Sequence, residues 1–167
     1  MVDITIKLAE QKDVPAVREI MAAARGAMAR PEDYITDPED YVRAHVSEKG
    51  FLILGLADGV TAGFFMVVKP EFVLENTGYE LDFPPEVLAV TAILDSVAVH
   101  PDFQGHGLME RMLQAALERL SDCRYFVATV APDNLVSLHN FEKCGFRPLK
   151  LIHKPGGQER YLMGKGF

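Results

Sequence analysis

Apolar residues recur along the chain with two spacings, one typical of strands and one typical of helices. Alternating or continuous short apolar runs predict strands, and apolar residues three and four apart predict helices. The expected strands cover residues 4–8, 51–57, 60–68, 87–99, 125–130, 146–153 and 159–163. The expected helices begin near Asp13, at Asp37-Pro38, at Met109, and at Asp133 or Asn134. The stripe that follows Met109 is typical of a helix lying on a sheet.

The turns between these elements indicate a mixed sheet. Asp58-Gly59 and Pro155-Gly156-Gly157 are typical of hairpins, which join antiparallel strands. The two late strand–helix–strand passages imply a parallel portion. Residues 69–86, rich in Pro, Asp and Glu, form a long connection of the kind that is often functional. With no repeat or linker, residues 1–167 are expected to form one α/β domain.

Composition narrows the function classes. The chain has 167 residues, 49% of them hydrophobic and 25% charged, which is typical of a globular domain with its own core. The net charge of −7 argues against nucleic acid or an anionic membrane as the main partner. Cys123 and Cys144 have no metal-ligand spacing, so we expect reduced core thiols, no metal and a cytoplasmic location. No segment predicts a signal peptide or a membrane span.

A glycine-rich turn joins the strand at 87–99 to the helix at Met109. It reads Gln104-Gly105-His106-Gly107. The first N–H groups of a helix have no internal partner, the helix dipole is positive there, and glycines allow a phosphate to come close. No Ser, Thr, Asp or Asn stands between Phe103 and Leu108 to cap those donors. The turn is therefore predicted to bind an anion.

Two motifs now resemble the GCN5-related N-acetyltransferase (GNAT) family. The family signature Arg/Gln-x-x-Gly-x-Gly/Ala is similar to Gln104 to Met109, and its Asn-opened helix that ends in Gly-Phe is similar to Asn134 to Phe146. The order of the elements is family-like along essentially the whole chain. The resemblance implies the acyl-CoA N-acyltransferase fold, a mostly antiparallel sheet with a splayed parallel pair and about four flanking helices.

The resemblance also implies acetyl-CoA as cosubstrate and direct acetyl transfer to an amine. It assigns the pyrophosphate to the backbone N–H groups of residues 105–109, and the thioester oxygen to the N–H of Val97, a donor that acts more strongly as charge develops. The cofactor-binding residues that it implies are Val97, Ala98, Val99, Gln104, Gly105, His106, Gly107, Leu108, Met109, Asn134 and Phe141.

Three positions depart from the family pattern. Met109 stands where the family has Gly or Ala, and its side chain either points away or weakens cofactor binding. Phe141 replaces the tyrosine that protonates the leaving thiolate in many members, so either another group serves or the thiolate leaves unassisted. Ile93 stands where several members place a glutamate base, and Asp95 lies two residues further along the same strand face.

Asp95 is the candidate base, because an amine must lose a proton before it attacks. Burial on an apolar strand would raise its pKa toward neutrality. The alternative is that Asp95 only hydrogen-bonds a loop. In the family, the acceptor pocket comes from the first two helices and the connection before the fourth strand. Candidate residues there are Asp33, Tyr34, Asp37, Tyr41, Glu71, Glu75, Tyr79, Glu80 and Asp82, which either attract an ammonium group or form a solvated acidic surface.

Two other functions compete with N-acetylation of a small molecule or peptide. One is an acyl-CoA-binding module with weak catalysis and a regulatory or interaction role, which the substitutions at Ile93, Met109 and Phe141 favour. The other is a dinucleotide-binding domain, but Glu110 stands where its third glycine would be. Homodimers are common in the family, so a homodimer is an expectation by analogy.

Overall fold

A seven-stranded sheet with the order β1-β2-β3-β4-β5-β7-β6 forms the centre of the protein. The computed structural model describes residues 1–76 and 81–167. The strands are β1 (Ile4–Leu8), β2 (Gly50–Ala57), β3 (Val60–Val68), β4 (Thr91–Val99), β5 (Tyr125–Val130), β6 (Arg147–His153) and β7 (Glu159–Lys165). Neighbouring strands are antiparallel except β4 and β5, which are parallel. The mixed sheet expected from the sequence is confirmed.

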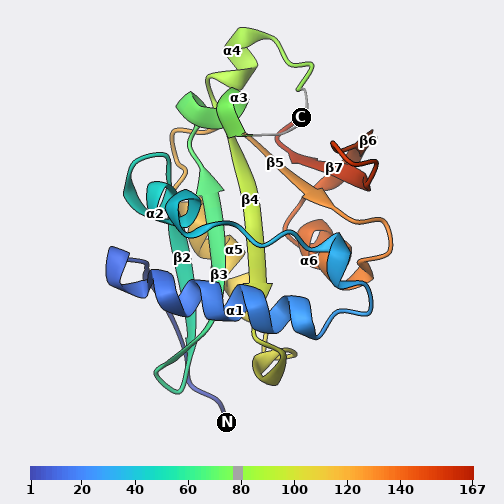
Figure 1. Ribbon diagram of the computed structural model, residues 1–167. Coiled ribbons are helices and arrows are strands. Elements are labelled where there is room, and N and C mark those ends of the chain that lie inside the picture. Colours follow the sequence, from blue (N-terminus) through green and yellow to red (C-terminus); the bar gives the residue numbers. More distant parts are fainter. Residues whose placement is uncertain (77–80) are drawn as a thin grey trace.

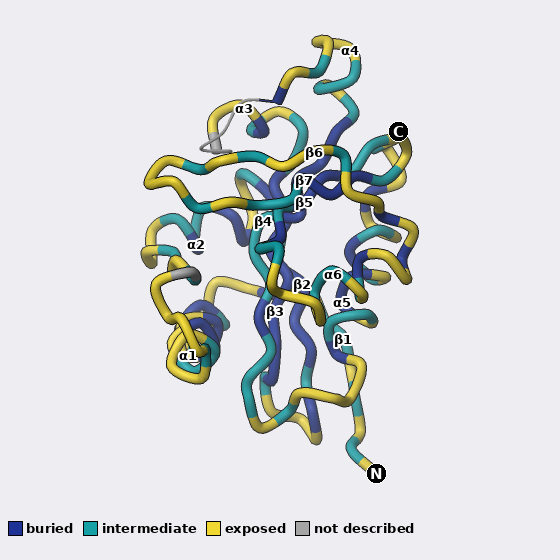
Figure 2. The backbone as a smooth tube through the Cα atoms, turned by 90° about the vertical axis from the view of Figure 1, so that its right-hand side faces the viewer, coloured by how far each residue is buried: buried dark blue, intermediate teal, exposed yellow. Residues whose placement is uncertain are grey.

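Helices cover both faces of this sheet, which gives the three layers seen in Figures 1 and 2. The longer helices are α1 (Val14–Gly26), α2 (Glu39–Ser47), α5 (Leu108–Glu118) and α6 (Leu135–Lys143). Successive strand residues point to opposite faces. Phe64 of β3 therefore packs in the cluster beneath α1 and α2, and Phe65 packs in the cluster beneath α5 and α6. Among the described residues, no helix has the length and apolarity that crossing a bilayer requires.

The prediction of a strand over residues 87–99 is wrong at its N-terminal end, because the strand starts later in the structure. Pro85–Leu88 form the short helix α4, and β4 starts only at Thr91. Proline suits the first turn of a helix, because its fixed φ is helical and no N–H is needed there. The Thr91 hydroxyl then donates a 2.6 Å hydrogen bond to the Val87 carbonyl and closes the turn. The preceding connection also contains a second short helix, α3 (Val73–Asn76).

A bulge at Asp95 interrupts the pairing of β4 with β3. Met66 of β3 is paired with Ser96, whereas the next residue, Val67, is paired with Leu94. Asp95 is therefore an extra residue with no partner on β3. A bulge of this kind disturbs the alternation of side chains and redirects one of them.

The bulge places two consecutive polar side chains on the same face of the sheet. Before it, Ile93 packs on the face that carries α1 and α2, and after it Ala98 packs on that face again. These two residues are an odd number of positions apart, so strict alternation would have separated them. Asp95 and Ser96 both line the space between β4 and α2 as a result.

β4 and β5 pair only over their first residues and then separate. Their parallel register runs from Thr91–Tyr125 to Leu94–Ala128 and ends there. Figure 1 shows the two strands diverging from this point. Among the described residues, no strand pairs with the β5 side of β4 beyond Leu94, so that part of the strand has a free edge.

Candidate active site

The turn between β4 and α5 exposes the start of a helix. Gly105 and Gly107 have φ values of +82° and +74°, a region that favours glycine. A Cβ at either residue would meet nothing within 4 Å, so the backbone angle and not the available space requires glycine. Gly107 is the N-cap of α5 and forms no side-chain cap hydrogen bond, as the sequence predicted. The turn therefore suits an anion that accepts from several backbone N–H groups.

The side chain of Met109 turns away from this anion-binding surface. Its sulfur accepts a 3.3 Å hydrogen bond from Nδ2 of Asn140 on α6. The same side chain packs against the core beneath α5. The bulk of Met109 therefore does not cover the N–H groups of the turn.

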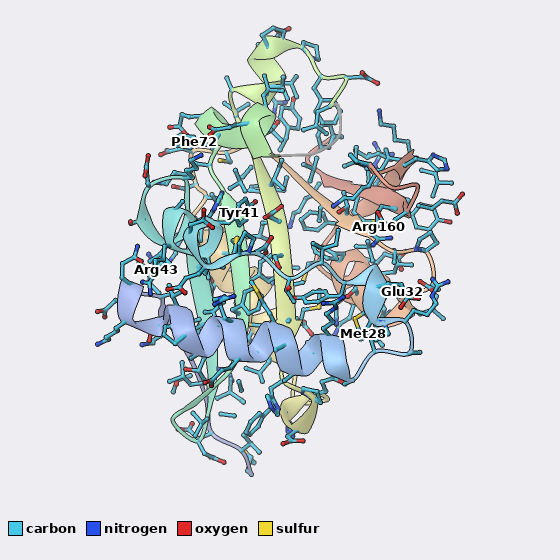
Figure 3. The ribbon with its side chains drawn as sticks, in the orientation of Figure 1. Met28, Glu32, Tyr41, Arg43, Phe72 and Arg160 are labelled. Atoms are coloured by element: carbon cyan, nitrogen blue, oxygen red, sulfur yellow. The ribbon has the colours of Figure 1, made fainter. Side chains whose placement is uncertain are left out.

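A cavity of about 600 Å³ opens where β4 separates from β5. Its walls come from the α1–α2 loop, the first turn of α2, residues 94–97 of β4, residues 129–131 at the end of β5, α6, and the β6–β7 hairpin. Figure 3 shows two of its residues, Tyr41 of α2 and Arg160 of β7, on opposite sides of β4. The cavity thus joins parts of the chain that are far apart in sequence.

Asp95 lies in this cavity and is fixed by a hydrogen bond. The Tyr41 hydroxyl donates to Oδ2 of Asp95 over 2.7 Å. Burial is the largest effect on the carboxyl group and raises its pKa, while the Tyr41 hydrogen bond and the charges of His45 and Lys154 oppose that rise. His45 is itself buried, and its Nδ1 donates to the Tyr41 carbonyl over 2.7 Å, because a carbonyl can only accept.

A second carboxyl group, Asp37, faces the same cavity. Pro38, and not Asp37, is the N-cap of α2, so the Asp37 side chain does not cap the helix. Burial first, and then the negative charge of Asp95, raise the pKa of Asp37 to about 7, while Lys154 lowers it. Two carboxyl groups close enough to influence each other titrate as a pair, and here one of them changes charge near neutral pH.

Tyr34 contributes a hydroxyl group that has no hydrogen-bond partner of good geometry among the described residues. Its oxygen is buried, and the side chain of Ser96 is the group nearest to a hydrogen bond with it, an interaction that opposes the rise of its pKa but is not well aligned. Burial raises the pKa of Tyr34 to about 12, so the hydroxyl keeps its proton at neutral pH. A buried hydroxyl that lacks a partner is costly, and a bound ligand would satisfy it.

A family model described as "Acetyltransferase (GNAT) family" matches residues 14–146. This chain belongs to the GNAT acetyltransferase family. No functionally curated protein is similar enough in sequence to match it.

Solved structures share the fold of this acetyltransferase at low sequence identity. The yncA protein of Salmonella typhimurium, solved with its cofactor acetyl-CoA, is 19% identical with a TM-score of 0.71, over 96% of this chain and 92% of that one. The ribosomal-protein-S18-alanine N-acetyltransferase of Escherichia coli is 20% identical with a TM-score of 0.70, over 98% of this chain and 93% of that one. An N-acetyltransferase of Staphylococcus aureus Mu50 is 17% identical with a TM-score of 0.71, over 97% of this chain and 96% of that one. These likenesses establish the acyltransferase fold.

The cofactor residues predicted from the sequence fall into two groups in this GNAT domain. Val97, Asn134 and Phe141 line the cavity, whereas Ala98 and Val99, the last two residues of β4, and residues 104–109 beyond the strand do not. Asn134 caps α6, since its Oδ1 accepts a 3.1 Å hydrogen bond from the N–H of Ser137. Phe141 is buried and packs edge-to-face against neighbouring aromatic rings, so it presents only carbon to the cavity.

The structure places only some of the predicted acceptor residues at the cavity. Tyr34, Asp37 and Tyr41 line the cavity of the acetyltransferase, but the described acidic residues of the connection at 69–86 do not. Those of Glu75 and Asp82 form ion pairs on the surface, with Lys49 and Lys150. Glu71 is exposed. Tyr79, Glu80 and the side chain of Asp33 lie outside the described residues.

Three cationic residues that line the cavity, Arg30, Lys154 and Arg160, were not found from the sequence. Lys154 and Arg160 flank the glycines of the β6–β7 hairpin and line the cavity. Burial is the main effect that lowers the pKa of Lys154; the charge of Arg160 adds to it, and Asp95 and Asp37 oppose it. Charged residues beside a hairpin turn are common on protein surfaces, so no local signal distinguished these two.

Proposed function

We propose that this acetyltransferase moves the acetyl group of acetyl-CoA directly to the primary amine of a small molecule or peptide. The observation that carries the proposal is the course of β4. Its free edge leads from the glycine turn into a cavity that holds two carboxyl groups. The family membership and the acetyl-CoA bound by the Salmonella neighbour support this choice of donor.

The residues present fit acetyl-CoA along the length of β4. The N–H groups of residues 105–109 would hold the pyrophosphate, with Gln104 and His106 exposed beside it. The extended pantetheine arm would add to the free edge at residues 97–99 in the manner of a further strand. Asn134 and Phe141 would flank the thiol end. Acetyl-CoA supplies a thioester carbonyl, and the N–H of Val97 would donate to its oxygen as negative charge develops there.

The Asp37–Asp95 pair is the group that accepts the proton of the amine. A general base is most effective when its pKa is close to the working pH, and the pKa of Asp37 is about 7. Tyr41 holds Asp95 in a fixed orientation through its 2.7 Å hydrogen bond. As the N–C bond forms and the C–S bond breaks, the amine proton passes to this carboxylate pair and CoA leaves as a thiolate.

The leaving thiolate does not obtain a proton from Phe141, which has none to donate. Thiols ionise near pH 8.5, so departure without an acid is feasible. Tyr34 is the other candidate, because its protonated hydroxyl lies in the cavity without a hydrogen bond to a described residue. Tyr34 is therefore our candidate for the general acid, a role that the sequence had left unassigned.

The first test is calorimetric binding of acetyl-CoA, with CoA and NAD as comparators. We expect acetyl-CoA and CoA to bind and NAD not to bind. Gly107→Ala, which strains the φ of +74°, should weaken acetyl-CoA binding about tenfold, whereas Gly26→Ala, where a Cβ has open space, should not. Absence of acetyl-CoA binding by the wild-type protein would refute the proposal.

The second test separates catalysis from binding. With acetyl-CoA saturating and a panel of amines, Asp95→Asn should lower kcat by about 10²–10³-fold and leave acetyl-CoA affinity unchanged. The amide oxygen of asparagine can still accept from Tyr41, so the fold is preserved. Glu19→Gln, an exposed change on α1, is the control. Binding without turnover by the wild type would instead support the acyl-CoA-binding module, and an unchanged kcat in Asp95→Asn would exclude Asp95 as part of the base.

A further inference from the structure

The cavity has a negative and a positive side. Asp37 and Asp95 occupy the side formed by β4 and the start of α2, and Lys154 and Arg160 come from the β6–β7 hairpin. Arg30, from the α1–α2 loop, also lines the cavity and pairs with Asp133 over 2.9 Å. A cavity built for a polycation would have acidic walls throughout, and this one does not.

Strand register explains why the hairpin cations face the carboxyl groups. Arg160 is paired with Ile152 across the hairpin, so their side chains share one face of the sheet. Lys154, the first residue after β6, lines the same cavity as Arg160. Ile152 packs against the cluster that contains Ile93 of β4. Asp95 lies two residues beyond Ile93 on that face. The two cations are therefore held on the same face as the carboxylates.

The two hairpin cations have different surroundings. Asp95 and Asp37 act on Lys154 and favour its charged form, so Lys154 compensates part of their negative charge. Arg160 lies close enough to Lys154 to lower its pKa, and Nη1 of Arg160 donates a 2.8 Å hydrogen bond to the Glu159 carbonyl. A planar guanidinium is also the group best shaped to bind a carboxylate with two parallel hydrogen bonds.

Arg30 and Arg160 also lie at the junction with a second hollow of about 380 Å³, between the hairpin and the β5–α6 loop. Both hollows share these two arginines, together with Ala131 and Asp133. A molecule with its amine at the carboxylate pair would thus place a neighbouring group beside the arginines and have space for the rest of its structure.

We propose that the amine acceptor is an amino acid or a close analogue, with its amine beside Asp95 and its anionic group bound by Arg160 and Lys154. This inference rests on the proposed acetyl transfer and adds the chemical class of the acceptor. The negative side of the cavity accepts the ammonium group and its proton. The positive side recognises the carboxylate, so a simple amine of the same size interacts only with the negative side.

The experiment compares amino acids with the amines that lack only the carboxylate. Phenylalanine is paired with phenethylamine and methionine with 3-(methylthio)propylamine, and β-alanine and γ-aminobutyrate extend the spacing. CoA release is measured at saturating acetyl-CoA. We expect at least one amino acid to exceed its carboxylate-free partner by 10–100-fold in kcat/KM. Arg160→Gln should reduce that ratio to nearly one, while Arg147→Gln, an exposed arginine of the same hairpin outside the cavity, should preserve it.

The outcomes distinguish this inference from the proposed function. If simple amines are acetylated as well as or better than amino acids, the enzyme is an acetyltransferase and the inference is wrong. If no amine is acetylated, acetyl transfer to amines fails, and calorimetry with the CoA-loaded protein and N-acetylphenylalanine or N-acetylmethionine decides the inference. Binding that Arg160→Gln weakens at least tenfold supports the anion site, and the absence of binding overturns it.

Discussion

Asp37→Asn tests the electrostatic account of the cavity most directly. The wild-type carboxyl group is buried beside Asp95, and its pKa is about 7 in the fold against 3.8 for an ordinary aspartate. Folding therefore favours the protonated form, and ionised Asp37 destabilises the protein. Asparagine has nearly the same shape and no charge to bury, so the variant should become more stable wherever wild-type Asp37 is ionised.

The pKa difference sets the size and the pH window of the effect. Because the folded-state pKa is raised, the penalty is absent below about pH 4, grows as the pH rises toward 7, and is constant above that. About three pKa units correspond to an upper limit of roughly 4 kcal/mol at pH 8.5, at 1.36 kcal/mol per unit. At pH 5 the penalty is only about 1.6 kcal/mol. The advantage of Asp37→Asn should therefore increase by roughly 2–3 kcal/mol between these two pH values.

Urea unfolding at pH 5.0 and 8.5 measures this difference for the wild type, Asp37→Asn and the exposed control Glu19→Gln. Thermal unfolding gives a second measurement. At pH 8.5 the melting temperature of Asp37→Asn should exceed that of the wild type by roughly 5–15 °C, since each kcal/mol of stability shifts the melting temperature of a domain of this size by about 2–4 °C. The same variant should lose at least tenfold in kcat/KM, because it lacks the group that ionises near neutral pH. A stability advantage that does not grow with pH would refute the reasoning, because it would show that Asp37 is not held against ionisation.

Three further changes probe the cofactor surface and the acid. Gly55→Ala would place a Cβ 2.4 Å from Cδ2 of Leu108, the first residue of α5. We therefore expect urea unfolding to show a loss of about 1–3 kcal/mol in stability and calorimetry to show weaker acetyl-CoA binding. Wild-type values for both would show that α5 tolerates displacement. Met109→Ala should leave the dissociation constant of acetyl-CoA within about threefold, because its side chain already turns toward α6 and, in the proposed binding mode, only backbone groups would contact the phosphate. A large change in that constant would place the side chain in the binding surface. Tyr34→Phe should leave the melting temperature unchanged or raised, since its buried hydroxyl has no well-aligned hydrogen-bond partner among the described residues, and should lower kcat about tenfold. Full kcat in that variant would exclude Tyr34 as the acid.

The sequence alone determined the order of the main elements and the position of the glycine turn. Those features depend on neighbouring residues. Apolar spacing sets strand or helix, glycine supplies the positive φ at residues 105 and 107, and Asn134 caps the helix that follows it. The failed prediction at 87–99 has the same local origin, since apolar residues after Pro85 suit a turn of helix as well as a strand. Short apolar runs do not separate the two.

The bulge at Asp95 had a partial signal in the sequence. Asp95 and Ser96 are consecutive polar residues in an otherwise apolar strand, which breaks strict alternation. Only the pairing with β3, where Met66 faces Ser96 and Val67 faces Leu94, turned that irregularity into a bulge with both side chains in the cavity. The sequence could therefore identify Asp95 as a candidate but not the surroundings that raise its pKa.

The tertiary structure alone decided which charges meet. Asp37 precedes the second helix, Asp95 lies in the fourth strand, and Lys154 and Arg160 belong to the last hairpin, yet all four line one cavity. Their mutual influence depends on distance and burial, which arise from strand order and register and not from any local pattern. For this reason the sequence could predict a phosphate-binding turn from adjacent residues, whereas the carboxylate pair and the opposing cations became visible only when the sheet brought them together.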